Sequence, residues 1–532
     1  MNNDVFLITS GAYANDEITS DFGLLPTSFL PVGHKRLLEL QIKLIENFIG
    51  KKFISLPDNY KLLHRDRDFI FENDIKIHWT NSNLSLSQSI LSFINALDLN
   101  GHSRLFILHG DTLFDNIKFE SDILSFGTTD MFYKWGDLID FQSNSLKSKF
   151  NKKVLSGYFS FSNIPLLKNE LNKSNSFELA LKGYHSKIPF NLVEGEGWLD
   201  FGHSNLYYRS KRKLNVTRSF NKAVVENNHI RKESIAVEKI KREYRWFKEV
   251  PEAISNFLPQ VWDFNQEQEK ASYVIEFIGA PTLQEKFVFG NLPDYVYFKI
   301  VDHVFDFINK SKSFINPIKD KINVFDNLKN LYIEKTKSRI KDFIDQSGFN
   351  SKQRITINGI KYPALNDFVL EVINVLESSI SDDQNSNKLT LMHGDLCFSN
   401  ILFDSRSNNI KIIDPRGSLT KDLDDSNIIY GDYRYDLAKL GHSLVGNYDF
   451  IVSGFYDLKF DSSLSIFEFN IQSSKREELV AYFFSKANSI GVTKEFLKAS
   501  ITNLFLSMLP LHNEDTDRQI ALMLNAYIIY YN

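Results

Sequence analysis

The sequence predicts two folded parts: an α/β part with a mostly parallel sheet at the N-terminus, and an α+β part at the C-terminus. In the first part, short apolar runs typical of buried strands alternate with segments of helical spacing, and this alternation favours a parallel sheet. In the second part, a hairpin pattern and a further strand precede mostly helical sequence. We place the parts at residues 1–212 and 213–532, and the lobes of the second at about 213–280 and 281–532.

The elements of the first part follow from the same patterns. Strands are expected at 5–8, 52–56, 75–79 and 104–108, helices at 37–48 and 85–97, and a polar loop at 9–21. Ligands of parallel α/β sheets bind at the carboxyl ends of the strands. The loop after the first strand and Asp111, which follows the fourth, are therefore expected at one site.

Composition narrows the function classes. The net charge of −4, from 62 basic and 66 acidic residues, lacks the basic surplus of a nucleic-acid-binding protein. No apolar run reaches the roughly 18 residues of a membrane span, and the N-terminus is not a signal peptide. The single cysteine, Cys397, is interpreted as a small buried side chain rather than a nucleophile. We expect a cytoplasmic protein whose partners are nucleotides and a small-molecule acceptor, with no nucleic acid and no membrane, and leave a homo-oligomer open.

The basic segment 209–218 (RSKRKLNVTR) separates the two parts. It is dense in positive charge and lacks an apolar pattern, so we interpret it as a solvated connector. A strip that contacts the substrate is the less favoured alternative.

The strongest signal is segment 391–417, LMHGDLCFSNILFDSRSNNIKIIDPRG. Asp395 lies in the loop opened by His-Gly, Asn400 follows it, and Asp414 ends an apolar strand. This spacing is typical of a phosphoryl-transfer site. One carboxylate orients and deprotonates the attacking hydroxyl, while the amide and the second carboxylate hold Mg²⁺ against the phosphates.

The segment resembles the aminoglycoside phosphotransferase and choline kinase family of small-molecule kinases, which have a protein-kinase-like fold. The resemblance implies ATP and Mg²⁺, with Asp395 as the catalytic base and Asn400 and Asp414 as metal ligands. A strand lysine paired with a helix glutamate positions the α- and β-phosphates in such enzymes. Lys232 and Glu243 are the candidates, with Arg231 as the alternative cation.

The rest of the second part is assigned by the same resemblance. Segment 272–283 matches the hinge between kinase lobes, so Glu276 and Phe277 are expected to line the adenine. Asp436 is expected to support the catalytic loop. Residues that could face the acceptor, or simply be polar surface, are Asp432, Tyr433, Arg434 and His442, and in the tail His512, Asp515 and Arg518.

The first part looks like a sugar-nucleotidyltransferase, a Rossmann-like fold, over roughly residues 3–212. The motifs are LLPTSFLPVGHKRLLELQI, HGDTLF and GWLDFGHSNLYYRS. The resemblance implies that Asp111 and Asp200 are catalytic and hold Mg²⁺ against the phosphates of a second NTP, with CTP favoured. The other residues that it implies in the site are Ser10 and Gly11 in the first loop, Lys35 near phosphate, and Gln88 and Ser89 near the base or sugar. His109 and His203 are expected to be structural, since Mg²⁺ favours oxygen.

This sequence departs from the family's pattern in its cations. The first loop has no arginine, and Thr27 stands where the family has lysine. Either Lys35 and Arg36 compensate, or this part binds a nucleotide or sugar phosphate without turning it over.

The whole chain is therefore expected to be a bifunctional enzyme. The second part would phosphorylate a sugar, polyol or amino alcohol with ATP, and the first would couple the monoester to an NTP for capsule or lipopolysaccharide precursors. The alternative is a kinase with a non-catalytic binding or dimerisation domain, and a nucleotide-sensing scaffold is the third reading.

Overall fold

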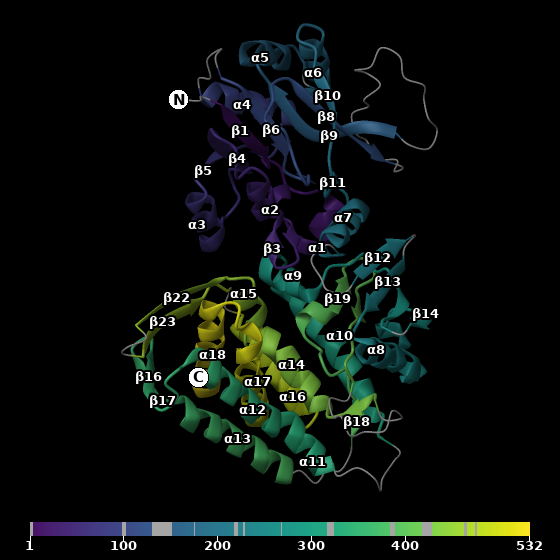
Figure 1. Ribbon diagram of the computed structural model, residues 1–532, viewed down its shortest axis with the longest axis vertical. Coiled ribbons are helices and arrows are strands. Elements are labelled where there is room, and N and C mark those ends of the chain that lie inside the picture. The colour runs from purple at the N-terminus through teal and green to yellow at the C-terminus, as the bar shows by residue number, and fades with distance from the viewer. Residues whose placement is uncertain are drawn as a thin grey trace. The chain divides into compact units, whose positions relative to one another are not determined.

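The computed structural model divides the chain into two compact units, unit 1 (Met1–Leu214) and unit 2 (Asn215–Asn532), whose elements are labelled in Figure 1. The structure describes residues 4–97, 103–129, 152–174, 176–216, 222–226, 229–267, 269–316, 324–382, 389–417, 428–461, 465–473 and 476–532. Within these ranges, no helix is both long enough and apolar enough to cross a membrane.

Unit 1 is built on a seven-stranded sheet with strand order β10-β8-β9-β6-β1-β4-β5. The pairs β6–β1, β1–β4, β4–β5 and β10–β8 are parallel, and β9 runs antiparallel to both of its neighbours. The strands are β1 (Val5–Thr9), β4 (Lys51–Pro57), β5 (Ile75–Thr80), β6 (Leu105–His109), β8 (Ile123–Thr129), β9 (Lys152–Phe161) and β10 (Asn191–Glu194). The mostly parallel, Rossmann-like sheet predicted from the sequence is therefore confirmed.

Both faces of this sheet are covered by helices. Successive side chains of a strand point to opposite faces, so Val5 and Leu7 of β1 enter one core while Phe6 and Ile8 enter another. The first core is completed by α4, α5 and α6, and the second by α2 and α3. The helices are α1 (Asp16–Phe22), α2 (Leu37–Leu44), α3 (His64–Glu72), α4 (Leu86–Ala96), α5 (Ile164–Lys173), α6 (Phe177–His185) and α7 (Ser204–Val216). The short elements are the 3₁₀ turn Thr27–Phe29 and the two-residue strands β2 (Pro31–Val32), β3 (Lys35–Arg36), β7 (Thr112–Leu113) and β11 (Leu199–Asp200).

Helix α1 was not expected, because the sequence predicts a polar loop over residues 9–21. The helix forms since the Asn15 side chain accepts a hydrogen bond from the Ile18 backbone N–H and caps the N-terminus. Ile18 and Phe22 are then buried on one side of the helix. Two apolar residues four positions apart are a short pattern, which the surrounding polar residues hide.

The division between the two units, after Leu214, falls within the predicted connector 209–218, but the segment is helical as far as Val216 because α7 continues to that residue. Lys211 is buried and its ammonium lies 5.8 Å from the centre of the Tyr207 ring and 5.7 Å from that of Tyr208. The long side chain thus packs against aromatic rings instead of extending into water.

Unit 2 begins with an antiparallel sheet of order β12-β13-β15-β14 and the helix α8. Its elements are β12 (Lys222–Glu226), β13 (His229–Ser234), α8 (Val237–Glu249), a 3₁₀ segment (Glu252–Phe257), β14 (Val261–Gln266) and β15 (Ala271–Glu276). The predicted hairpin is confirmed by the β12–β13 pairing, while its expected turn at 227–228 lies outside the described residues.

The rest of unit 2 is mainly helical, so together with the sheet at its start the α+β class of this part is confirmed. The helices are α9 (Leu283–Phe289), α10 (Asp294–Ser313), α11 (Val324–Lys329), a π-helical turn (Asn330–Glu334), α12 (Lys335–Ser347), α13 (Leu365–Asp382), α14 (Tyr433–Leu444), α15 (Tyr448–Val452), α16 (Glu477–Ser489), α17 (Lys494–Met508) and α18 (Thr516–Tyr531), with 3₁₀ turns at Phe398–Asn400 and Leu509–His512. The strands are β16 (Arg354–Ile357), β17 (Ile360–Ala364), β18 (Thr390–Leu391), β19 (Ile401–Asp404), β20 (Asn409–Ile412), β21 (Tyr430–Gly431), β22 (Tyr456–Asp461) and β23 (Ile466–Ile471). A second sheet, β17-β16-β23-β22, was not predicted.

A buried ion pair fixes the start of α2 in unit 1. The Arg36 and Asp66 side chains are 3% and 6% exposed, and Nη2 of Arg36 lies 3.0 Å from Oδ2 of Asp66. Removing one partner of such a pair leaves a buried charge uncompensated. We expect Asp66→Ala to lower the free energy of unfolding by about 3–5 kcal/mol, measured by urea denaturation. The control is Asp68→Ala, whose side chain is 47% exposed and pairs with His64. A cost for Asp66→Ala no larger than that of the control would contradict the expectation.

Candidate functional site

The first candidate site lies at the carboxyl ends of β1 and β6. These strands are parallel neighbours in which Thr9 is opposite His109, and the Gly110 N–H donates to the Thr9 carbonyl oxygen at 2.9 Å. The chain crosses from one side of β1 to the other at this point, where open α/β sheets bind ligands. The loops that leave these strands carry Ser10 and Asp111.

The first loop is packed by its neighbours. Ser10 is buried, its N–H donates to Ser55 Oγ at 3.1 Å, and its Oγ accepts from the Ser28 N–H at 3.0 Å. A Cβ atom at Gly11 would lie 2.4 Å from Thr80 Cγ2, so only glycine fits there. The loop is thus held rigidly, but it supplies no positive charge.

Of the two substitute cations, Arg36 is not available to a phosphate. Its guanidinium is buried, bonds Asp66 through Nε at 3.2 Å and Nη2 at 3.0 Å, and donates to the Phe29 carbonyl oxygen at 2.9 Å. The expectation that Arg36 compensates is therefore wrong, because the fold uses its charge internally. Lys35 is exposed on β3, and its role near phosphate stays a prediction.

Asp111 and Asp200 lie side by side although 89 positions separate them in the sequence. Strands β7 and β11 pair so that Asp200 is opposite Thr112, and the Phe201 N–H donates to the Asp111 carbonyl oxygen at 2.8 Å. A Cβ atom at Gly202 would lie 2.6 Å from Oδ2 of Asp111 and 3.3 Å from Oδ1 of Asp200. Both carboxylates therefore border the same point.

The two carboxylates line a cavity of 380 Å³. Phe177, Trp198 and His203 contribute to its wall, as does His109 at the end of β6. Cavities of about 300–1,000 Å³ suit small-molecule ligands. The mixed lining of rings and carboxylates fits a ligand that has both flat and charged portions.

Burial sets the charges in this cavity. It raises the pKa of Asp111, an effect that a backbone hydrogen bond, Thr112 and His203 only partly offset. It also lowers the pKa of His109 to about 4, against the opposing influence of Asp200, so that imidazole is neutral at pH 7. A cation between the carboxylates would offset the cost of their burial, and oxygen donors suit Mg²⁺.

A metal ion here would need ligands beyond the two carboxylates. Among the described residues, no three His, Cys, Asp or Glu side chains are grouped as a metal site. Mg²⁺ in phosphoryl- and nucleotidyl-transfer sites takes its remaining ligands from substrate phosphates and water. The donor set therefore fits Mg²⁺ held together with a nucleotide, and its presence stays a prediction.

Gln88 has a structural partner at the N-terminus of α4. Its side chain accepts from the Ser85 N–H at 3.0 Å, while Ser85 Oγ accepts from the Gln88 N–H at 3.3 Å, which is a capping box. Ser89 Oγ lies 3.2 Å from the position of a Cβ atom at Gly11. Contact of either side chain with a base or sugar stays a prediction.

The second candidate site, in unit 2, is organised by Lys232. This residue of β13 forms ion pairs with Glu243 of α8 and with Oδ1 of Asp414, the latter at 2.8 Å. Burial acts to lower the pKa of Lys232, but Asp414 and Glu243 outweigh it and raise the pKa above the ordinary value. The expected lysine–glutamate pair thus exists, and it reaches the carboxylate that ends segment 391–417.

The loop that carries Asp395 is held by backbone hydrogen bonds to buried groups. Asp436 of α14 accepts from the N–H groups of His393 and Gly394 at 2.7 and 2.8 Å. The His393 ring donates from Nε2 to the Ile413 carbonyl oxygen at 3.0 Å and accepts from the Asp395 N–H at 3.2 Å. Burial lowers the pKa of His393 to about 4, which keeps this one tautomer neutral. The loop and the end of β20 are thereby joined.

Asp395 lies between two cations that the sequence did not single out. Its Oδ1 is 3.1 Å from Nζ of Lys439 and its Oδ2 is 2.9 Å from Nη2 of Arg416. Burial acts to raise the pKa of Asp395, but Lys439 and Arg416 outweigh it and lower the pKa. The side chain is therefore a carboxylate at neutral pH. Lys439 lies three positions after Asp436 on α14. This spacing places both side chains on one face of the helix, and it could have indicated that Lys439 also faces the loop.

The expected metal ligands lie next to this loop. The Asn400 side chain donates from Nδ2 to the Asp395 carbonyl oxygen at 2.8 Å, and its amide oxygen accepts from the Ser399 hydroxyl at 3.5 Å. Asp414 has a φ of 58°, a left-handed conformation that non-glycine residues adopt rarely, although Asp and Asn adopt it more often than other residues. Desolvation acts to raise the pKa of Asp414, whose side chain is still 49% exposed, and Lys232 outweighs it and lowers the pKa. These oxygen donors fit Mg²⁺.

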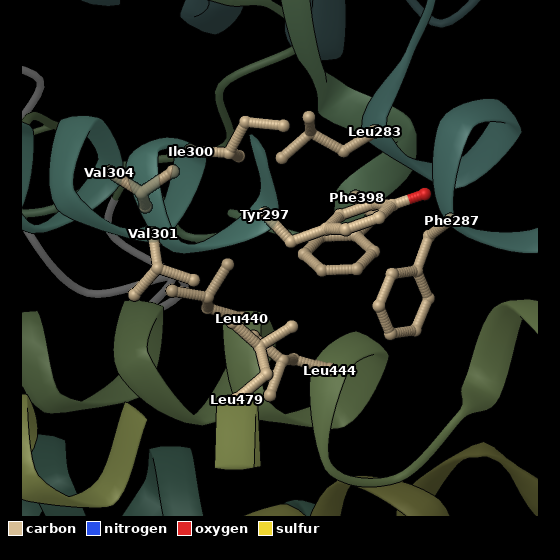
Figure 2. A pocket seen from close by; sticks show the side chains of 10 residues that line it. All are labelled: Leu283, Phe287, Tyr297, Ile300, Val301, Val304, Phe398, Leu440, Leu444 and Leu479. Carbon is tan, nitrogen blue, oxygen red and sulfur yellow. The ribbon is translucent and has the colours of Figure 1, made fainter. Parts of the chain in front are cut away.

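Phe398, in the same segment as Asp395, lies among apolar side chains from several helices, as Figure 2 shows. Its ring centre lies 5.0 Å from that of Phe287. The void that they line with Leu283, Tyr297 and Leu440 measures 10 Å³, about the limit for one water molecule. It is a packing gap and not a substrate site.

Other expected residues have partners inside the protein. The Glu276 carboxylate, at the end of β15, accepts from the Gln260 N–H at 3.0 Å, and the neighbouring Phe277 is half-buried. Arg434 pairs with buried Asp432 at 2.8 Å. Asp432, Arg434 and His442 are all buried, so the alternative that they are polar surface residues is wrong. Asp515 caps α18, and Arg518 pairs with Glu514 at 3.1 Å.

Cys397 lies in the same loop. Burial raises its pKa to about 12, so the thiol remains protonated and is a poor nucleophile.

Comparisons with known proteins place both expected kinds of fold among the matches. No family model and no curated protein matches the chain. CTP:phosphocholine cytidylyltransferase LicC from Streptococcus pneumoniae matches with 12% identity over 40% of this chain and all of its own, at a TM-score of 0.31. HddC from Yersinia pseudotuberculosis has 18% identity, the same two coverages and a TM-score of 0.28. A thermostable mutant of aminoglycoside phosphotransferase APH(4)-Ia has 12% identity over 60% of this chain and 97% of its own, at a TM-score of 0.36. Both kinds of protein that the sequence resembles are thus found.

The support of the loop by Asp436 leads to a stability prediction. In Asp436→Ala two buried N–H groups lose their acceptor, at about 1–3 kcal/mol each. We expect urea denaturation, followed by fluorescence and circular dichroism, to show a loss of this size and a smaller one for Asp436→Asn, whose amide oxygen can still accept. The exposed Asp457, which accepts from Gln472, provides the control Asp457→Ala. Equal stabilities of Asp436→Ala and the control would refute the supporting role.

Proposed function

We propose that the chain is a bifunctional enzyme whose C-terminal part is an ATP-dependent small-molecule kinase. The supporting observation is the joined array of charged groups: Lys232 with Glu243 and Asp414 on one side, and the loop of Asp395 and Asn400 on the other. Lysine and glutamate in this pairing orient nucleotide phosphates. These are the residue types that phosphoryl transfer requires.

In this proposal Asp395 receives the acceptor hydroxyl. Its low pKa makes it a weak base, so its main contribution is to orient the hydroxyl and take the proton late in the transfer. Asp414 and Asn400 would hold Mg²⁺, which neutralises phosphate charge when it is bound. Lys232, now paired with Asp414, would bind the α- and β-phosphates.

We infer further that the N-terminal part couples the kinase product to an NTP, with CTP favoured, and releases pyrophosphate. The paired Asp111 and Asp200 in a cavity of 380 Å³ support this reaction. A monoester made by a kinase is the usual second substrate of a nucleotidyltransferase, so the two reactions would be consecutive. Such products are precursors of capsule or lipopolysaccharide, which is the proposed setting.

One observation favours the alternative, a kinase with a non-catalytic N-terminal part. Two cations, Lys35 and Arg36, were expected to replace the missing arginine and lysine around the triphosphate. Arg36 is paired with Asp66, so only Lys35 of these two can contact a phosphate. Pyrophosphate release requires charge stabilisation of the leaving group. A part with so few cations could bind a nucleotide or sugar phosphate without converting it.

The kinase proposal is tested by Asp395→Asn in the full-length chain. Loss of the base should reduce phosphoryl transfer about 10²-fold or more, while Mg·ATP binding, measured by calorimetry, persists. Acceptors come from sugars, polyols and amino alcohols incubated with ATP, and products are identified by mass spectrometry. The control is Asp404→Asn, a carboxylate of β19 that is 36% exposed. Near-normal turnover by Asp395→Asn would contradict the assignment of Asp395 as the base.

The two-step proposal is tested by Asp200→Asn in the full-length chain supplied with the accepted compound, ATP and each of CTP, UTP and GTP. Loss of one of the paired carboxylates should stop pyrophosphate release while the phosphate monoester accumulates. Asp68→Asn on α3 should leave both steps intact, since its side chain is 47% exposed. If the wild-type chain makes the monoester but releases no pyrophosphate with any NTP, the non-catalytic alternative takes its place.

A further inference from the structure

The surroundings of Asp395 carry more positive charge than its own neutralisation requires. Arg416 and Lys439 each contact one of its carboxylate oxygens, at 2.9 and 3.1 Å. Two more cations, Lys335 and Arg339, come from the first turns of α12. The ring centre of Tyr332, three positions before Lys335, lies 5.9 Å from that of Tyr435 on α14, so α12 begins beside the helix that carries Lys439.

Lys335 is the least compensated of these cations. It is half-buried, and within the described part of the chain no hydrogen bond or ion pair satisfies its ammonium group. Burial lowers its pKa to about 8, and Arg339, Lys439 and Arg416 lower it too, with only Asp395 opposing. A charge that is both desolvated and repelled costs free energy until an anion joins it.

Arg339 also has hydrogen-bond donors that could bind an anion. Its Nη1 donates to the Ser507 carbonyl oxygen at 2.8 Å, a neutral acceptor that leaves most of the guanidinium donors for another group. Lys335 and Arg339 are four positions apart on one helix, so their side chains project from the same face. A guanidinium beside an ammonium is a common pairing for an oxyanion.

These cations serve a different place from the nucleotide phosphates. Lys335 interacts with the charge of Asp395, the expected base, whereas Lys232 pairs with Asp414 and Glu243. Cations grouped around the base would act on the molecule that offers its hydroxyl. A cationic acceptor such as an amino alcohol would be repelled there, and a neutral polyol would leave the charge uncompensated.

We propose that the acceptor of the kinase site carries an oxyanion, a phosphate or carboxylate group, which Lys335 and Arg339 bind while its hydroxyl lies at Asp395. This inference rests on the proposed kinase function and replaces its neutral or cationic acceptors with anionic ones. In the reaction, a bond forms between the acceptor oxygen and the γ-phosphorus, and the bond to the β–γ bridging oxygen breaks. ADP leaves, and the hydroxyl proton passes to Asp395 and then to solvent.

The first test compares four groups of acceptors with the full-length protein, Mg²⁺ and ATP, measuring ADP release. The groups are sugar phosphates with glycerol 3-phosphate, hydroxy acids such as glycerate, neutral sugars with glycerol, and ethanolamine with choline. The kcat/KM should be at least tenfold higher for an acceptor of the first or second group, and the better of the two identifies the oxyanion. Turnover confined to neutral or cationic acceptors would overturn the inference while upholding the kinase.

The second test uses Lys335→Gln and Arg339→Gln. Each should raise the KM for the anionic acceptor at least tenfold and leave the KM for ATP within twofold, and Lys335→Arg should restore most of the affinity. The matched control is Lys337→Gln, because Lys337 is an exposed lysine of the same helix that pairs with Glu334 at 3.4 Å. Unchanged acceptor KM values in both variants would overturn the inference.

A binding measurement keeps the inference testable if no acceptor is converted, a result that would count against the kinase itself. With Mg·AMP-PNP present, inorganic phosphate should bind the wild-type protein and Lys337→Gln equally in calorimetry. Lys335→Gln and Arg339→Gln should bind it at least tenfold more weakly. Absence of phosphate binding to the wild type, or equal binding by all four proteins, would refute the oxyanion site.

Discussion

The buried contact between Asp436 and the backbone of His393 and Gly394 is the constraint on which the C-terminal site depends. Because Asp436 of α14 accepts both N–H groups, the position of the loop relative to this helix is fixed. His393 then links that loop to Ile413, immediately before Asp414. The positions of the expected base and of the expected metal ligand are therefore coupled through one imidazole.

Burial of the Asp436 carboxylate costs free energy, so other contacts must hold this network in place. Burial raises the pKa of Asp436 to about 7, since its two backbone hydrogen bonds only partly offset the loss of water and the nearby charges of Asp395 and Asp432. A group in this state persists only where surrounding packing fixes it. Phe398, set in the apolar core beside Phe287, supplies that packing from the same loop.

How far the site could be predicted depended on whether contacts are local in the sequence. The spacing of Asp395, Asn400 and Asp414 predicted their neighbourhood, because short strands and a tight loop leave few alternatives. The mostly parallel sheet of unit 1 was likewise predictable from alternating strand and helix patterns. Arg36 could not be assigned, because only the folded chain decides that Asp66 is buried beside it. Lys335 and Arg339 carried no local signal, since α12 lies far from segment 391–417 in the sequence.

The two candidate sites also differ in whether their carboxylates are already paired with cations of the protein. In unit 1, Asp111 and Asp200 lie together and the first loop carries no cation, so this site favours a metal ion before it favours a phosphate. In unit 2, Lys232 already neutralises Asp414. A nucleotide with its metal would therefore exchange partners with existing charges there instead of introducing uncompensated ones. Exchange of this kind requires little reorganisation, which is what a preorganised transfer site provides. The electrostatics thus support the kinase assignment more strongly than the nucleotidyltransferase assignment, independently of any resemblance in sequence.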